Sequence, residues 1–204
     1  MLPRLQFLTC DGAACGHAEQ ARLALGGGVR WVQLRAKGLE ERAWIRLARE
    51  VGALCRDAGA TFVVNDSPRV AAEAGADGVH LGPTDPTPGE ARALLGGGAI
   101  VGVTVNFPAH LDRLRGARVD YVGAGPLRAT ATKPGHAAPH TEESLRALVS
   151  AAGLPAFVIG GVTAADAPLL ARLGAHGLAV SAAIARAPDP RAAARALVAA
   201  VGGV

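Results

Sequence analysis

The chain has 204 residues, half of them apolar and only 3% aromatic, with a formal net charge of +4. A chain of this size can bury one sizeable core, so we expect residues 1–204 to form a single domain. The arginines are scattered without interleaved aromatic residues, which argues against nucleic acid as a partner, whereas the positive charge suits small anionic ligands.

Two features of the sequence predict a cytoplasmic protein with no membrane partner. The N-terminus MLPRLQFLTC lacks a basic region followed by a long apolar run, and no stretch approaches the roughly 18 apolar residues of a membrane span. Cys10, Cys15 and Cys55 have neither CxxC spacing nor a nearby histidine cluster, so we interpret them as reduced thiols. The sequence leaves the oligomeric state open, and a homo-oligomer is compatible with it.

Short apolar runs rich in β-branched residues recur along the chain and predict strands. They cover residues 5–8, 31–34, 61–64, 78–81, 100–103, 121–123, 156–159 and 177–180. The segments between these runs have the spacing of helices. Residues 39–58, for example, place Leu39, Ala43, Leu47, Val51 and Leu54 on one helical face.

Two helix starts are marked by capping residues. Thr87 is followed by Pro88 and Glu90, which is the pattern of an N-cap, a proline in the first turn and a capping box. Ser67-Pro68 repeats the first two features. Strands and helices therefore alternate, which predicts an α/β fold, most simply a closed (β/α)8 TIM barrel with an open doubly wound sheet as the alternative. The repeated passage from helix end through glycine to strand in LALGGGVRWVQLR, AAEAGADGVHLG and LARLGAHGLAVSA favours the barrel.

Polar residues gather after the predicted strands, where a barrel carries its function. Gln33, Arg35 and Lys37 alternate after the second strand, and their spacing predicts side chains that point the same way, toward an anion in the barrel mouth. A solvated strand edge is the alternative. Asp66 and Asp85 follow the third and fourth strands, and neighbouring strand ends should bring them together as ligands of a Mg²⁺ ion that carries a pyrophosphate. Each aspartate alone also fits a turn or a helix cap.

The later strands carry a second set of candidates. Thr104 ends the fifth strand, and the chain's only lysine besides Lys37 is Lys133, which follows Thr130 and Thr132 in the loop after the sixth strand. This loop suits a phosphate clasp or, alternatively, a polar surface. The seventh and eighth strands run into Gly160 and Gly161 and into Val180 and Ser181, where barrels frequently bind a phosphate. Two anion sites facing one mouth suggest the joining of two phosphorylated substrates.

These motifs together resemble those of the thiamine-phosphate synthase family. VQLRAK, VVNDSPRVAAEAGADGVHLGPTD, VGVT, DYVGAGPLRATATKPG, FVIGGV and LAVSAAI occur in the family's order and span nearly the whole chain. The resemblance implies a (β/α)8 barrel that displaces Mg²⁺-bound pyrophosphate from a hydroxymethylpyrimidine and joins that ring to a thiazole phosphate, giving thiamine phosphate. This reaction needs no protein nucleophile or strong base, only positioning and electrostatic stabilisation.

The resemblance also implies a role for each matching residue. Lys133, Arg35, Lys37 and Thr104 would stabilise the departing pyrophosphate, and Asp66 and Asp85 would bind Mg²⁺. The other implied contacts, all to substrate, are Gln33, Asn65 and His80 near the pyrimidine, Thr130 and Thr132 in a closing loop, and Gly160, Gly161, Val180 and Ser181 around the thiazole phosphate.

The chain departs from the family pattern at Pro83, at Arg128-Ala129 and at Thr9-Cys10-Asp11. A related thiazole tautomerase is one alternative, although Pro126 stands where its pattern has a catalytic histidine, and His136 or His140 would then have to serve as base. A non-catalytic barrel that binds thiamine phosphate is the other. Two carboxylates suited to a metal argue against it, because binding a product alone does not require costly buried charge.

Overall fold

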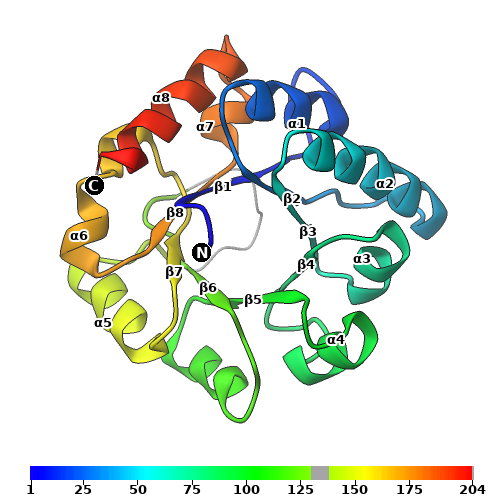
Figure 1. The fold of residues 1–204 in the computed structure, drawn as a ribbon. Helices are drawn as coiled ribbons and strands as arrows, with labels where there is room; N and C mark the ends of the chain where they lie inside the picture. Colours follow the sequence, from blue (N-terminus) through cyan, green and yellow to red (C-terminus); the bar gives the residue numbers. More distant parts are fainter. Residues whose placement is uncertain (130–137, 204) are drawn as a thin grey trace.

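Parallel strands form a closed ring in the computed structural model, which describes residues 1–129 and 138–203 (Figure 1). The ring closes because the first strand pairs with both the second and the last, Phe7 lying opposite Val32 on one side and Val180 on the other. In order, the strands are β1 (Leu5–Leu8), β2 (Trp31–Leu34), β3 (Thr61–Asn65), β4 (Gly78–Leu81), β5 (Ile100–Val105), β6 (Tyr121–Ala124), β7 (Ala156–Val158) and β8 (Gly177–Val180). The predicted (β/α)8 barrel is confirmed, and the open sheet was wrong.

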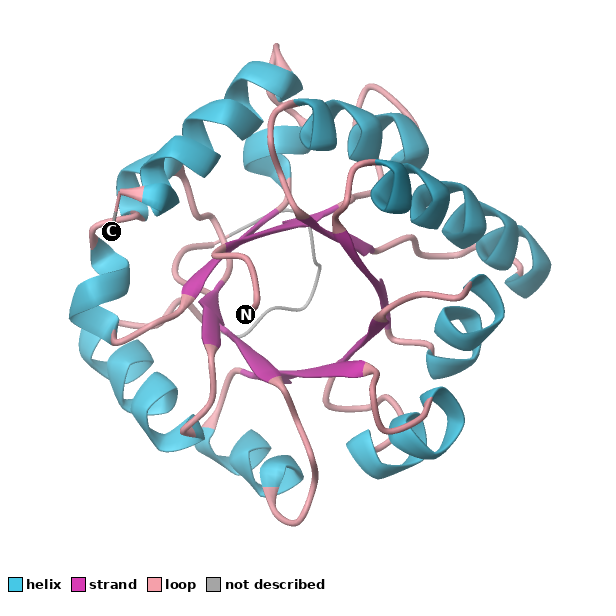
Figure 2. Cartoon of the chain, in the orientation of Figure 1, coloured by secondary structure: helices cyan, strands magenta, loops and turns pink. Residues whose placement is uncertain are grey.

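Helical segments surround the strands on the outside of the barrel (Figure 2). They are α1 (His17–Gly26), α2 (Glu41–Asp57), α3 (Pro68–Ala74), α4 (Pro88–Leu95), α5 (Glu142–Ala152), α6 (Leu169–Leu173), α7 (Ala182–Ala185) and α8 (Pro190–Gly202), with 3-10 turns η1 (Pro108–Leu114) and η2 (Ala164–Asp166). Among the residues that the structure describes, no helix combines the length and apolar character needed to cross a membrane.

The capping signals were correct, whereas the predicted start of one helix was not, although Leu47, Val51 and Leu54 do belong to or pack against the core. Thr87 and Glu90 form the predicted capping box, and Ser67 caps α3 by accepting a hydrogen bond from the Val70 N–H at 3.1 Å. Helix α2 begins later than the sequence predicts, because the Glu40 side chain caps it, and Leu39 therefore stays outside the helix, 41% exposed. The buried face of α2 is Ala48, Val51, Gly52 and Cys55.

The barrel interior has a floor of large apolar side chains. Trp31 packs edge-to-face on Tyr121 and on Phe157, with ring centroids 4.8 and 4.9 Å apart. Leu2, from the segment before β1, packs against this cluster, and the N-terminus lies over the centre of the ring in Figure 1. The interior is thus filled at the amino ends of the strands, which leaves the space for a ligand at their carboxyl ends.

Candidate active site

A cavity of about 130 Å³ opens at the carboxyl ends of the strands, and side chains from or just after every strand of the ring line it. Polar groups come from β1 to β5, and glycines and small residues from β6 to β8. The lining residues are Gln6, Leu8, Gln33, Arg35, Asn65, His80, Thr104, Asn106, Gly123, Gly125, Pro126, Ile159, Gly160, Gly161, Val162, Ala179, Val180, Ser181, Ala182 and Ala183.

Three predicted pyrimidine contacts lie together in this cavity. Gln33, Asn65 and His80 all line it, and each is at least nine-tenths buried. The Gln33 side chain donates to Gln6 Oε1 at 3.3 Å, while its own Oε1 is buried and accepts no hydrogen bond from the described residues. Because an unpartnered buried acceptor is costly, Gln33 Oε1 is suited to a hydrogen-bond donor on a ligand.

Arg35 and Lys37 line different hollows, whereas the prediction placed both with Gln33 at one anion site. Arg35 lines the cavity, but Lys37 lines a neighbouring surface depression together with Asp66. The Lys37 ammonium forms an ion pair with the Asp66 carboxylate. Side chains alternate between the two faces only within a strand, and β2 ends at Leu34. The alternating spacing therefore does not predict the position of the Lys37 side chain, which lies beyond the strand.

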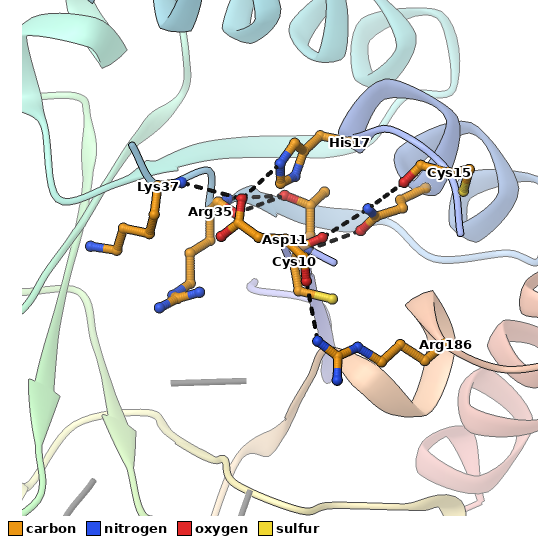
Figure 3. Close-up of polar contacts among 9 residues, drawn as sticks. Cys10, Asp11, Cys15, His17, Arg35, Lys37 and Arg186 are labelled. Carbon is orange, nitrogen blue, oxygen red and sulfur yellow. Dashed lines mark hydrogen bonds and ion pairs between the residues drawn. The ribbon is translucent and has the colours of Figure 1, made fainter. Parts of the chain in front are cut away.

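The loop after β1 holds the segment that carries these two cations. Thr9 Oγ1 accepts from the Arg35 N–H at 3.0 Å, and Asp11 Oδ1 accepts from the Lys37 N–H at 3.4 Å. The Arg186 guanidinium, from beyond β8, donates to the Asp11 carbonyl at 3.1 Å. Figure 3 shows the Arg35 and Lys37 side chains extending away from Asp11. In the sequence, Thr9 and Asp11 stand out only as a difference from the family pattern. Their hydrogen bonds to the Arg35 and Lys37 backbone were not predicted, because the partners lie 26 positions away.

The two carboxylates predicted to meet do interact. Burial raises the pKa of Asp85, and the negative charge of Asp66 raises it further, while a hydrogen bond from the Gly82 N–H opposes both effects. Gly82 N lies 2.6 Å from Asp85 Oδ2, and Asp66 directs Oδ2 at Lys37. Each carboxylate therefore keeps one oxygen that these contacts do not use. A carboxyl whose pKa is raised by a neighbouring carboxylate marks a site that a cation would stabilise.

This pair is compatible with magnesium chemistry. In residues 1–129 and 138–203, no group of three or more His, Cys, Asp or Glu side chains is arranged to hold a metal ion. Mg²⁺ commonly uses one or two protein carboxylates and completes its shell with water and phosphate oxygens. Asp66 and Asp85 fit that description of a magnesium site that is completed by a substrate.

Arg113 fixes the loop that presents Asp85. Its guanidinium donates to the carbonyl oxygens of Gly82 at 2.7 Å, Asp85 at 3.2 Å and Pro86 at 2.8 Å. These contacts span Pro83, one of the departures from the family pattern. The loop is therefore held from both ends despite the proline.

The opposite side of the cavity is built from backbone rather than charge. Gly160 and Gly161 have φ of +93° and +63°, and a Cβ on Gly160 would lie 2.5 Å from the Pro126 Cβ. Only glycine fits there without strain. Val180 and Ser181 line the same wall, and the Ser181 Oγ is buried with no partner in the described part of the chain. This wall can hold an anion through N–H groups and one hydroxyl.

Arg128, another departure from the family pattern, ties the β6 loop to the β7 loop. Its guanidinium pairs with both oxygens of Asp166, at 2.8 and 2.6 Å, and donates to the Gly161 carbonyl at 3.1 Å. Hydrogen bonds from Arg128 lower the pKa of Asp166, a bond from the Thr163 N–H adds to that, and burial opposes it. The Arg128–Asp166 pair therefore holds the loop that contains Gly160 and Gly161 in place.

The predicted closing loop falls largely outside the described residues. Thr130, Thr132 and Lys133 lie there, as does His136. His140 is described: its Nδ1 lies 2.9 Å from Ser144 Oγ, and its N–H donates to the Pro126 carbonyl at 2.9 Å. His140 is therefore engaged at the start of α5, and it is not one of the cavity-lining residues.

The fold and the cavity define a (β/α)8 barrel with a candidate active site at the carboxyl ends of its strands. A family model described as thiamine monophosphate synthase matches residues 5–184. Thiamine-phosphate synthase of Laribacter hongkongensis is 39% identical over 197 residues, covering 95% of this chain and 93% of the relative, and that of Azorhizobium caulinodans is 42% identical over 182 residues, covering 89% and 86%.

Solved structures agree with these relatives. A thiamine phosphate pyrophosphorylase from Pyrococcus furiosus superposes with a TM-score of 0.87 at 29% identity, covering 98% of this chain and 96% of that one. KGPDC from Streptococcus mutans, with a TM-score of 0.72 at 16% identity over 100% of this chain and 99% of that one, shares the fold alone. The chain belongs to the thiamine-phosphate synthase family, a family of transferases.

Proposed function

We propose that this protein joins hydroxymethylpyrimidine pyrophosphate to the thiazole phosphate, giving thiamine phosphate and pyrophosphate. The observation that carries the proposal is the division of one cavity into a charged side, with Arg35, Lys37 and the paired carboxylates close by, and a glycine side. The first suits a pyrophosphate and the second a monophosphate. Both substrates are small molecules.

In this reaction the bond between the pyrimidine methylene carbon and the pyrophosphate oxygen breaks, and its electron pair leaves with pyrophosphate. The thiazole nitrogen then supplies the electron pair of the new C–N bond, so no proton has to move. Arg35, Lys37, Thr104 and Lys133 are proposed to stabilise the leaving group, the role of Lys133 resting on the family resemblance.

The Gln33 amide, Asn65 and His80 would orient the pyrimidine ring, because they are the buried polar groups that line the cavity beside Arg35. Gly160, Gly161, Val180 and Ser181 would hold the thiazole phosphate, with Thr130 and Thr132 in the loop above. Fixing the two rings this way supplies most of what a dissociative displacement needs.

Asp66 and Asp85 are the residues that would hold Mg²⁺. When bound, the ion would neutralise negative charge on the departing pyrophosphate. The chain's own contribution is to keep the two carboxylates together and to support them with Gly82 and Lys37.

The cytoplasm is the proposed compartment. All three cysteines are free, Cys10 and Cys55 are buried, and burial raises the pKa of Cys55 to about 12, which suits a thiol kept reduced.

The test is a stoichiometric assay with both substrates and Mg²⁺, in which thiamine phosphate and pyrophosphate are measured in the same samples. The proposal predicts equal amounts of the two products, neither appearing when one substrate is left out. Turnover of the thiazole substrate alone, without pyrophosphate release, would instead support the tautomerase. Binding of thiamine phosphate with no turnover of either substrate would support the non-catalytic barrel.

A further inference from the structure

Five polar side chains form a continuous hydrogen-bonded network across the barrel interior, and all of them except Tyr121 line the cavity. Gln33 donates to Gln6 at 3.3 Å, and Gln6 Nε2 donates to the Tyr121 hydroxyl at 3.1 Å. That hydroxyl lies 3.0 Å from His80 Nδ1, and His80 Nε2 lies 3.0 Å from Thr104 Oγ1. This network joins Gln6 and Tyr121, two buried residues outside the predicted site, to three residues within it.

Glycines on neighbouring strands make room for this arrangement. A Cβ on Gly102 would lie 2.1 Å from the Tyr121 ring, and one on Gly123 would lie 3.2 Å from the His80 ring. Gly102 pairs with Tyr121, and Gly123 pairs with Thr104, in the β5–β6 register. The barrel therefore leaves out two side chains at the places that Tyr121 and His80 occupy, which marks the network as a built feature of the interior.

The hydrogen bonds of this network have a defined order of donors and acceptors, from Gln33 through Gln6 to Tyr121. Gln6 Oε1 is occupied by Gln33, so the Gln6 group facing Tyr121 is its amide nitrogen, which can only donate. The Tyr121 oxygen accepts that bond and must place its own proton elsewhere. Tyr121 is fully buried, and burial also raises the pKa of its hydroxyl, so the proton stays on and needs an acceptor. His80 Nδ1 lies within reach of it.

We infer that Gln6 and Tyr121 hold His80 as the neutral tautomer with its proton on Nε2, which turns the Thr104 hydroxyl into a donor toward the cavity. His80 Nε2–H donates to Thr104 Oγ1, so the Thr104 proton is directed to a ligand atom rather than to the histidine. Gln6 and Tyr121 are positioning residues that act through His80. The consequence for turnover rests on the proposed function, because it assumes that the ligand presents an acceptor to Thr104.

Nuclear magnetic resonance of the substrate-free protein tests the tautomer directly. The protein is labelled with ¹⁵N-histidine, and the His80 signals are assigned by their loss in His80→Asn. At neutral pH, long-range proton–nitrogen correlations should show an unprotonated Nδ1 and a protonated Nε2. A proton on Nδ1, or on both nitrogens, would overturn the inference. This outcome is independent of the product assay, which tests the proposed function in the wild-type protein.

Two variants test the positioning role. Tyr121→Phe removes the donor to Nδ1, and Gln6→Met removes the group that orients the Tyr121 hydroxyl. Each should turn the single His80 tautomer into a mixture and lower kcat five- to tenfold, with the KM for thiazole phosphate unchanged. Gln20→Met is the matched control, a second buried glutamine whose contacts are to Cys10 and Cys15, and it should leave the His80 tautomer as it is. An unchanged tautomer or an unchanged kcat in folded Tyr121→Phe would refute the role of Tyr121.

Discussion

The two sides of the cavity present different kinds of group to a ligand. The side built from β2 to β5 has the Arg35 guanidinium at the cavity and the Lys37–Asp66 ion pair with Asp85 beside it. The side built from β7 and β8 has glycines at positive φ and the Ser181 hydroxyl, which has no partner among residues 1–129 and 138–203. Side-chain charge can stabilise a leaving group whose charge grows during the reaction, whereas backbone N–H groups suit a phosphate whose charge stays constant. Changes on the first side should therefore affect kcat, and changes on the second should affect KM.

The largest expected effect is on the charged side. Asp66→Asn removes one carboxylate charge while keeping its size, and asparagine tolerates the φ of 67° that Asp66 adopts. We expect kcat to fall by about 100-fold or more, because charge stabilisation of this kind is typically worth several kcal/mol. Steady-state kinetics at saturating Mg²⁺ measure the effect.

The control for this variant is Asp57→Asn, at the exposed end of α2, which removes the same charge far from the cavity. It should leave kcat unchanged. The midpoint temperature of thermal unfolding of Asp66→Asn should stay close to that of the wild-type protein. The Lys37–Asp66 pair is partly exposed, and such pairs contribute about 1 kcal/mol or less to stability. Wild-type turnover in Asp66→Asn would remove Asp66 from the mechanism.

A smaller effect is expected on the glycine side. Gly160→Ala places a Cβ 2.5 Å from the Pro126 Cβ at a φ of +93°, so the loop has to shift. The KM for thiazole phosphate should rise about tenfold, equivalent to about 1.4 kcal/mol of lost binding, with little change in kcat. Kinetics with thiazole phosphate as the varied substrate provide the measurement.

Gly153→Ala is the control for Gly160→Ala. It places an alanine at a positive φ without the close contact to Pro126, so it measures the cost of the backbone conformation alone. Gly153 has a φ of +61° at the end of α5, and a Cβ added there would meet nothing within 4 Å. The substitution should lower stability by about 1 kcal/mol without changing the KM. Equal KM values for the two variants would show that the Gly160 wall does not hold the phosphate.

The smallest expected effect concerns the brace between the β6 and β7 loops. Asp166→Asn removes the charge that Arg128 pairs with, and we expect a loss of about 1 kcal/mol in the free energy of unfolding at pH 7. The pKa of Asp166 is lowered in the folded protein, so its contribution is complete above the ordinary carboxyl pKa of about 4 and is lost as the pH falls through the lowered value.

Urea unfolding at several pH values tests this sign. The stability difference between the wild-type protein and Asp166→Asn should be constant from pH 7 to about 5 and shrink below about 4. Glu142→Gln, which breaks the exposed pair with Arg172, should cost less at every pH. A difference that grows on acidification would contradict the direction of the Asp166 shift.

The sequence predicted the barrel well because its signals are local and repeated. Each strand is a short apolar run, and Ser67 and Thr87 mark helix starts by hydrogen bonds within three residues. The meeting of Asp66 and Asp85 was also predictable, since parallel strand ends share one edge. The predicted start of α2, at Leu39, was too early. The spacing of apolar residues does not show where an N-cap such as Glu40 begins the helix.

The contacts that support the site were not predictable, because they join residues distant in sequence. Arg128 and Asp166 are separated by 38 positions, and Gln6 and Tyr121 by 115. A glutamine within the apolar run LQFL was the one available signal for the interior network. The turn of Lys37 toward Asp66 depends on the loop beyond β2, where no periodic pattern applies.

Titration calorimetry of the two anions tests the division of the cavity most directly. We expect pyrophosphate to bind the wild-type protein tightly only with Mg²⁺ and to lose that enhancement in Asp66→Asn. Thiazole phosphate should bind with the same affinity in the presence and absence of Mg²⁺, in both proteins. Pyrophosphate binding that ignores Mg²⁺, or thiazole phosphate binding that requires it, would contradict the assignment of the charged side to pyrophosphate and of the glycine side to the monophosphate.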